Sequence, residues 1–547
     1  MSGFDPLDWI KTGRVKKANV LRSAFLVGGF TSMSRVLGLA RDFLTAGFFG
    51  TSLAMSAFVV AFRIPNMFRA LFGEGALSSA FIPVFIETRR RDGEAAAWSL
   101  ARKIITLVGL ALLGVVVLGI AVLSAARALA PAGSKTFFIV SLARIMLPYL
   151  FFICLAGISM GILNSYHRFA LPASTPSLLN LVWIAFVLFV CPRAGRTINE
   201  QIYGLAWGVF AAGIVQLAAQ IPALMRRGYR PGLALDLRDE RVLRVFKLMG
   251  PAALGLAVTQ VNVMINSLLA AWVGPWAPAA LFYSERLIYL PQGLLATAMS
   301  TVLLPVLSGH AAREEHAQIR ETINHSLRSV FFIMAPAALG LLALARPIVQ
   351  MIFEWNRFTP ASTDLTAVAL QFYAPGLLVF CLAKVFVPAF YAAQDTRTPV
   401  KIGLLCVTLN FALNVLFLLT WPLRLKHASL ALATVLSEGV NGLLLGCFLH
   451  RRFGSPGWKT IFASAARILL CAGATAACAA LIQSRLAGLL DSAGWPAKAN
   501  QIAAVLASIA AAMGIYFAAA AALRCPEIGH VREAFRRRGN NRAAGCE

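Results

Sequence analysis

Apolar stretches long enough to cross a lipid bilayer recur along this chain and limit its fold more than any other feature. A spanning helix needs about 20 mostly apolar residues, and about fourteen such stretches occur here. They run at about 23–48, 53–85, 104–130, 137–164, 172–191, 202–225, 243–273, 277–309, 326–353, 365–393, 399–422, 428–450, 460–482 and 500–523. Only 13% of the 547 residues are charged, against about 25% in soluble domains. The sequence therefore predicts an all-α polytopic membrane protein.

Lysine and arginine are concentrated in alternate loops between these stretches. The N-terminus, the loops after even-numbered helices and the C-terminus hold about 32 of them, and the opposite loops hold about 10. By the positive-inside rule, both termini are expected in the cytoplasm. Because the formal net charge of +27 lies mainly in these short loops and not on a solvated basic face, no nucleic-acid partner is expected.

A short pattern repeats between the two halves of the chain. Pro148-Tyr-Leu150 with Cys154 recurs as Pro375-Gly-Leu377 with Cys381, displaced by 227 residues. Many transporters are built from such repeats. The pattern predicts two six-helix lobes around a central cavity, followed by two further helices. The expected division is an N-lobe at 1–225, a cytoplasmic linker at 226–242, a C-lobe at 243–452, and helices 13 and 14 with a basic tail at 453–547.

Charged residues remain inside the expected helices, and bases outnumber acids among them. The bases are Arg35, Arg41, Arg63, Arg69, Arg144, Arg286, Lys384 and Arg467, and the acids are Asp42, Glu74, Glu285 and Glu438. A charge near the middle of the bilayer costs roughly 3 kcal/mol, so most of these must pair, line a wet cavity or reach an interface. A structural ion-pair network is one alternative for helices 1, 2 and 8. It leaves a surplus of bases, which favours a cavity for an anionic guest such as phosphate.

Signatures of enzymes and cofactor sites are missing from the sequence. The histidines show no metalloprotease spacing, the nine cysteines form no CxxC pair, and there is no phosphate-binding GxxxxGK[ST] loop. We therefore expect a transporter with no catalytic residue, metal or cofactor.

Four segments of the chain carry specific motifs: Met33-Ser-Arg35-Val-Leu-Gly-Leu-Ala-Arg41-Asp42, Phe62-Arg63-Ile-Pro65-Asn66-Met-Phe-Arg69-Ala-Leu-Phe-Gly-Glu74-Gly75, Tyr283-Ser-Glu285-Arg286-Leu and Gln394-Asp395-Thr-Arg-Thr-Pro399. These motifs resemble the MurJ (MviN) family of bacterial lipid II flippases, part of the multidrug/oligosaccharidyl-lipid/polysaccharide exporter superfamily. The resemblance implies a bacterial inner-membrane protein with a V-shaped central cavity, and a groove near helices 13 and 14 for the polyprenyl tail. It implies lipid II and membrane lipids as partners, a monomeric state, and contact with the cell-wall synthesis machinery.

The resemblance also assigns substrate-binding residues. Cavity arginines of the family match Arg35, Arg41, Arg69 and Arg286, with Asp42 and Glu74 as acidic companions and Glu285 and Arg63 beside them. The chain departs from the family at Ser56 and Glu285, which stand where aspartate is usual, and at Tyr289, which replaces an acid. Helices 7 and 11 offer only neutral amides where some members bind sodium: Asn262, Asn266, Asn410 and Asn414. Transport is therefore expected not to depend on sodium, unless Glu438 supplies the missing charge.

The resemblance implies movement of the lipid II headgroup from the cytoplasmic to the outer leaflet by alternating access, for cell-wall biogenesis. A flippase for another polyprenyl-diphosphate oligosaccharide is the nearest alternative. A drug/cation antiporter of the same superfamily would need a net anionic cavity, and a non-transporting scaffold would leave the membrane arginines replaceable.

Overall fold

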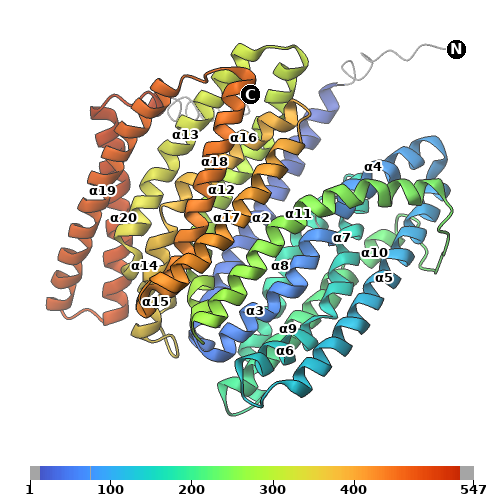
Figure 1. Cartoon of the computed structure of the whole chain (residues 1–547), viewed down its shortest axis with the longest axis horizontal. Helices are drawn as coiled ribbons and strands as arrows, with labels where there is room; N and C mark the ends of the chain where they lie inside the picture. The colour runs from blue at the N-terminus through green and yellow to red at the C-terminus, as the bar shows by residue number, and fades with distance from the viewer. Residues whose placement is uncertain (1–12, 74–75, 530–547) are drawn as a thin grey trace. The chain divides into compact units, whose positions relative to one another are not determined.

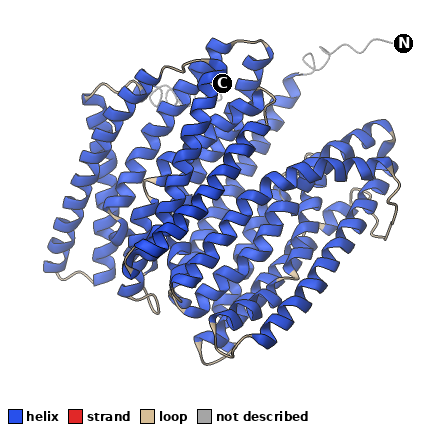
Figure 2. Ribbon diagram, viewed as in Figure 1, coloured by secondary structure: helices blue, strands red, loops and turns tan. Residues whose placement is uncertain are grey.

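The computed structural model describes residues 13–73 and 76–529, and these parts of the chain are helical without strands (Figures 1 and 2). The all-α fold predicted from the apolar stretches is confirmed. The chain divides into two compact units, Met1–Ser267 and Leu268–Glu547. The division falls inside α11, Glu240–Val273.

The first unit holds α2 to α10 and most of α11. Its elements are α2 (Gly13–Phe49), α3 (Leu53–Phe68), η1 (Arg69–Gly73), α4 (Ala76–Arg91), α5 (Gly93–Leu129), α6 (Lys135–Met146), α7 (Tyr149–Ser165), α8 (Ala170–Ala185), η2 (Phe186–Val190), η3 (Cys191–Arg193), α9 (Ile198–Ala218) and α10 (Ile221–Met225). Hydroxyl caps set several of the helix starts. For example, Ser52 Oγ accepts from the Met55 amide at the start of α3, and Thr197 with Glu200 forms a capping box at the start of α9.

The second unit holds the end of α11 and the helices that follow. Its elements are α12 (Ala277–Ala312), α13 (His316–Ala343), α14 (Ala345–Phe353), α15 (Pro360–Tyr373), α16 (Gly376–Ala392), α17 (Arg397–Thr420), η4 (Leu423–Leu425), α18 (Lys426–Phe453), α19 (Trp458–Ser492) and α20 (Ala497–Ala522). Helices α13, α19 and α20 share a buried cluster that includes Phe332, Ile468 and Tyr516. The Tyr516 hydroxyl donates to the Phe332 carbonyl at 2.8 Å, so this cluster satisfies its own polar group.

Nine of the described helices are long and apolar enough to span a bilayer, or eleven if each of two bent pairs counts as one span. The other stretches expected from the sequence correspond to α2, to α3 with η1 and α4, and to α12. Each of these carries at least one arginine, and the count of spans covers only the described residues. A total of about fourteen spans stays a prediction.

The repeat found in the sequence is also present in the backbone. Helix α7 begins at Tyr149 and ends at Ser165, and α16 begins at Gly376 and ends at Ala392, so both boundaries are displaced by 227 residues. The preceding helix meets α7 at a bend of 42° and α16 at a bend of 44°. A residue in the left-handed region lies two positions beyond the end of each helix, His167 at φ 57° after α7 and Gln394 at φ 58° after α16. Prolines at 148 and 375 explain the equal bends, because proline cannot donate the helical backbone hydrogen bond.

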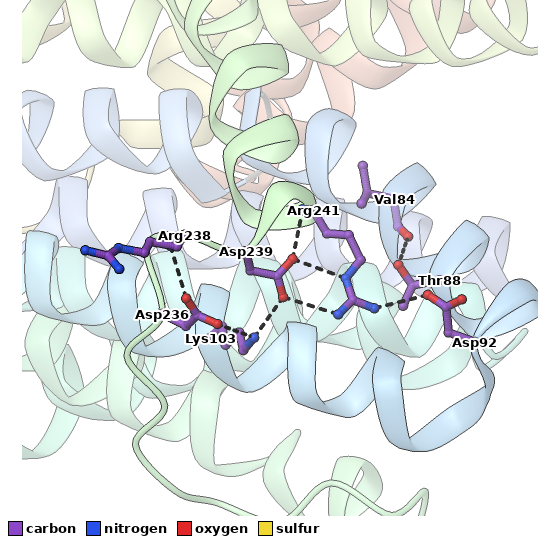
Figure 3. A network of polar contacts seen from close by, with 8 residues as sticks. All are labelled: Val84, Thr88, Asp92, Lys103, Asp236, Arg238, Asp239 and Arg241. Atoms are coloured by element: carbon purple, nitrogen blue, oxygen red, sulfur yellow. Dashed lines mark hydrogen bonds and ion pairs between the residues drawn. The ribbon is translucent and has the colours of Figure 1, made fainter.

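Ion pairs join the expected linker, 226–242, to helix α5 of the same unit (Figure 3). The Lys103 ammonium of α5 donates to Asp236 Oδ2 at 2.7 Å and to Asp239 Oδ2 at 2.8 Å. Arg241 in turn donates to Asp239 and, at 3.1 Å, to Asp92 at the start of α5. The linker is therefore fixed to the first turns of α5 by charges of both signs.

The environment of Asp239 favours its ionised form. Burial by itself would raise the pKa of this carboxyl, but hydrogen bonds from Arg241 and Lys103 outweigh that effect and hold the pKa well below its usual range. A carboxyl with a depressed pKa stabilises the fold above its unfolded pKa, and that contribution is lost only as the pH falls through the folded value. The linker network therefore stays intact at neutral pH.

Candidate functional site

Arg41 of α2 is buried, and its guanidinium is held by two side chains. Its Nε and Nη2 atoms donate to Asp42 Oδ1 at 2.9 and 2.7 Å, and its Nη1 atom donates to Asn180 Oδ1 of α8 at 3.0 Å. Arg41 is 9% exposed and Asp42 is 4% exposed. Because a buried charge is costly unless it is paired and hydrogen-bonded, these contacts explain how the fold tolerates an arginine here.

A tryptophan of α8 completes the surroundings of Arg41. The Arg41 guanidinium lies 4.7 Å from the centre of the Trp183 ring, within the range of a cation–π interaction. The indole Nε1 donates to Thr45 Oγ1 at 3.0 Å, and that hydroxyl donates to the Arg41 carbonyl at 2.7 Å. Phe58 of α3 packs edge-on against the same ring. Residues from three helices therefore fix the position of one arginine.

Arg69 lies where helix α3 changes its hydrogen-bonding pattern. It is the first residue of η1, a single turn of π-helix, and its Nε donates to Asn66 Oδ1 at 3.0 Å. Such turns are rare and are frequent at functional sites, since they redirect side chains and free backbone carbonyls. Arg35 on α2 and Arg63 on α3 are half-buried in the same unit, and Ser56 is buried on α3.

The remaining predicted charges lie in the second unit or outside the described residues. Arg286 of α12 lies over the Phe282 ring at 4.4 Å, and both Arg286 and Glu285 are half-buried. The Tyr373 hydroxyl of α15 donates to Glu285 Oε1 at 3.3 Å. Glu74 falls in the undescribed segment 74–75. The structure thus joins Arg41 directly to Asp42, whereas in the second unit Glu285 contacts Tyr373 and Arg286 contacts Phe282.

The amides considered for sodium contact one another on α17. Asn414 Nδ2 donates to Asn410 Oδ1 at 3.0 Å, and Asn410 Nδ2 donates to Ser437 of α18 at 3.3 Å. Both asparagines are fully buried. Glu438 of α18 accepts from Asn441 at 3.0 Å. In the part of the chain that the structure describes, no group of three or more His, Cys, Asp or Glu side chains could hold a metal ion.

Sequence reasoning missed the residues that hold Arg41. The sequence did not predict that Asn180, Trp183 or Thr45 lies at the site. A signal was present, because Asn180 is an amide inside an apolar stretch, and such a residue needs a buried partner. The identity of that partner required the tertiary structure.

Comparison with known proteins identifies the family. A family model described as "Lipid II flippase MurJ" matches residues 45–492. The lipid II flippase MurJ of Burkholderia cenocepacia is 37% identical over 464 residues, which cover 81% of this chain and 87% of that protein. The probable lipid II flippase MurJ of Rhizobium meliloti is 34% identical over 517 residues, covering 93% and 95%.

Solved structures agree in fold. A structure of lipid II flippase MurJ in an inward closed conformation matches with a TM-score of 0.73 at 24% identity, covering 91% of this chain and 98% of that one. An inward-facing multidrug resistance MATE transporter of the MOP superfamily matches with a TM-score of 0.64 at 14% identity, covering 80% and 99%. With the family match over most of its length, this chain belongs to the MurJ family of lipid II flippases.

Proposed function

We propose that this protein moves the headgroup of lipid II from the cytoplasmic to the outer leaflet of the bacterial inner membrane. The observation that carries the proposal is the surplus of arginine inside the expected membrane helices of a chain that belongs to the MurJ family. A diphosphate linkage carries negative charge and several acceptor oxygens. Guanidinium groups match such oxygens bidentately, which makes arginine better suited than lysine to hold this group.

The mechanism we propose is alternating access. The lobes, 1–225 and 243–452, would rock about a central cavity in which Arg35, Arg41, Arg69 and Arg286 hold the diphosphate. Asp42, Glu285, Glu74 and Arg63 would tune the local charge. A cavity that is positive without substrate and nearly neutral with it would favour closure around the bound headgroup, because burial of unpaired charge is costly.

The polyprenyl tail would remain in the bilayer throughout the cycle. Extraction of a long chain would cost about 0.8 kcal/mol for each CH₂ group, which excludes a path through the aqueous cavity. Helix α19 offers an apolar surface for the tail, since Phe462, Leu470 and Leu481 are each more than 60% exposed. These exposed side chains support a tail-binding groove on α19 and α20, the last two of the expected membrane helices.

Growth of a depleted strain tests this function. Expression of the chain in a bacterium depleted of its own lipid II flippase is expected to restore growth and cell shape. Lipid II is expected to become accessible at the outer face to an impermeant reagent. Failure of both measurements with normal membrane insertion would overturn the proposal. Rescue of a strain that lacks an O-antigen flippase, without any effect on lipid II, would assign a different polyprenyl-diphosphate substrate.

The charge of the loops predicts the orientation of the chain, with both termini in the cytoplasm. Single cysteines placed at 50 and 275 in a cysteine-free variant are expected to react with an impermeant thiol reagent added to intact cells. Cysteines at 92 and 235 are expected to react only after permeabilisation. The opposite labelling pattern would reverse the topology.

Flipping is expected not to require sodium. A sodium ion in a low-dielectric interior needs compensating charge, and the side chains available on α17 are the neutral pair Asn410 and Asn414. Lipid II accessibility is expected to be unchanged when choline replaces sodium at constant membrane potential. Activity that is lost on sodium removal and restored by its return would show that neutral amides, or Glu438 nearby, suffice.

A further inference from the structure

The side chain of Asn180 bonds to two points of α2, one at Arg41 and one next to Arg35. Its Oδ1 accepts from Arg41 Nη1 at 3.0 Å, and its Nδ2 donates to the carbonyl of Ser34 at 3.0 Å. Ser34 immediately precedes Arg35 and lies seven residues before Arg41, so both bonds fall on one helical face. Gly38 lies between them, and a Cβ there would be 3.7 Å from Asn180 Nδ2. The amide therefore spans a length of α2 that carries both arginines.

We infer that Asn180 is a positioning residue for phosphate recognition, which acts through Arg41 and through the helical turn that carries Arg35. The inference rests on the proposed function, because it assigns a purpose to the orientation of these two arginines. It adds a residue of α8 to a site otherwise composed of charged residues on other helices.

The geometry of Arg41 shows what this positioning achieves. A guanidinium has five N–H donors. Asp42 accepts from Nε and Nη2, and Asn180 accepts from Nη1, so the plane of the group is fixed and one N–H remains on each Nη atom. A group held in this way loses little rotamer entropy when it binds an oxyanion. Asp42 alone would leave Nη1 without its bond to α8.

The neutral charge of the amide is as important as its shape. Arg41 is paired with Asp42, and Asn180 accepts from Arg41 without adding a charge. An aspartate at position 180 would keep an acceptor for Arg41 but would remove the donor to Ser34. It would also add a negative charge where the diphosphate is expected. A purely structural role for Asn180 predicts that probe binding falls only where stability falls, whereas a positioning role predicts weakened binding in a variant that remains folded.

Binding and stability measurements on purified full-length variants separate these roles. The variants are Asn180→Asp, Asn180→Leu and a control, Gln216→Leu. Gln216 is another buried amide of the first unit, and its Nε2 donates to the Thr175 carbonyl of α8 at 2.9 Å. The probe is a polyprenyl diphosphate in detergent, with thermal unfolding measured in parallel. Both Asn180 variants are expected to bind the probe at least about tenfold more weakly than the control. Asn180→Leu loses the charge-assisted hydrogen bond to Arg41, and Asn180→Asp, expected to be weaker still, loses the donor to Ser34 and adds a negative charge.

Each outcome supports or overturns the inference. Thermal midpoints close to that of Gln216→Leu, combined with weakened binding, would support a positioning role. Binding equal to that of the control in either Asn180 variant would overturn it. Should Asn180→Leu fail to fold, Asn180→Asp decides, because it keeps the size of the side chain. If Arg41→Ala loses binding and Asn180→Asp does not, only the role of Asn180 is overturned. If Arg41→Ala binds the probe fully, the proposed function itself is contradicted.

Discussion

Alanine at any one of the arginines proposed to hold the diphosphate is expected to abolish growth of the depleted strain while membrane levels of the protein stay near normal. The four positions are Arg35, Arg41, Arg69 and Arg286. Each substitution removes a positive charge and a bidentate donor from the proposed cavity, where one charge-assisted hydrogen bond would be worth about 1.5–3 kcal/mol. Lysine is expected to restore part of the activity, since it keeps the charge but lacks the planar fork.

Arg144 supplies a matched control for these variants. It is also an arginine inside an expected membrane helix, and its Nη1 lies 3.5 Å from Ser124 of α5, within the first unit. Its replacement by alanine is expected to leave growth intact, because a role at the membrane interface does not involve the substrate. Normal lipid II accessibility in the four alanine variants, at normal protein levels, would remove arginine from the mechanism.

The sequence was sufficient to predict the helices and the repeat because both depend on local properties. Long apolar stretches can satisfy their backbone groups in lipid only as helices, or as closed barrels that these lengths do not suit. The two prolines at 148 and 375 each place a bend at the same point of their repeat. The arginine-bearing helices were also recognisable from the sequence. The charges that these helices carry identify the candidate site.

The pairing of side chains could not be predicted in the same way. Arg41 and Asn180 are 139 residues apart, and only the packing of α2 against α8 brings them together. Arg35 and Asp42 are seven residues apart, so helical spacing predicts that they share a face, whereas adjacent helical residues do not normally face one another. In the structure Asp42 binds its neighbour Arg41, because the long arginine side chain folds back to reach the carboxylate.

Glu527 is a buried charge that the sequence did not predict, because it lies beyond the last apolar stretch. Glu527 follows α20, in a segment that sequence analysis treated as part of a basic tail. It is only 3% exposed. Its Oε1 accepts from Arg328 Nε of α13 at 2.8 Å and from Ser464 Oγ of α19 at 2.5 Å. One carboxylate therefore joins the end of the described chain to two helices of the second unit.

Replacement of Glu527 by alanine is expected to destabilise the protein by about 3 kcal/mol, the lower end of the cost of breaking a buried ion pair, because Arg328 keeps some contact with solvent. Thermal or denaturant unfolding in detergent measures this loss. Glutamine keeps an oxygen for both donors but loses the charge, so Glu527→Gln is expected to lose less stability than Glu527→Ala.

Burial would raise the pKa of Glu527, but hydrogen bonds from Ser464 and Arg328 outweigh that effect, and the pKa is lowered. The advantage of glutamate over glutamine should therefore shrink below about pH 4.

The exposed ion pair between Arg346 and Asp364 is the control for the buried pair between Glu527 and Arg328. Its 2.7 Å separation is as short as that of the buried pair, but its side chains are 57% and 56% exposed. Exposed pairs contribute about 0–1 kcal/mol, because water screens their attraction and ordering the side chains costs entropy. Asp364→Ala is therefore expected to leave the unfolding midpoint almost unchanged. Equal losses in Asp364→Ala and Glu527→Ala would mean that burial does not set the strength of these pairs. A large loss in Glu527→Ala alone would identify this carboxylate as the residue that fastens the end of the described chain to α13 and α19.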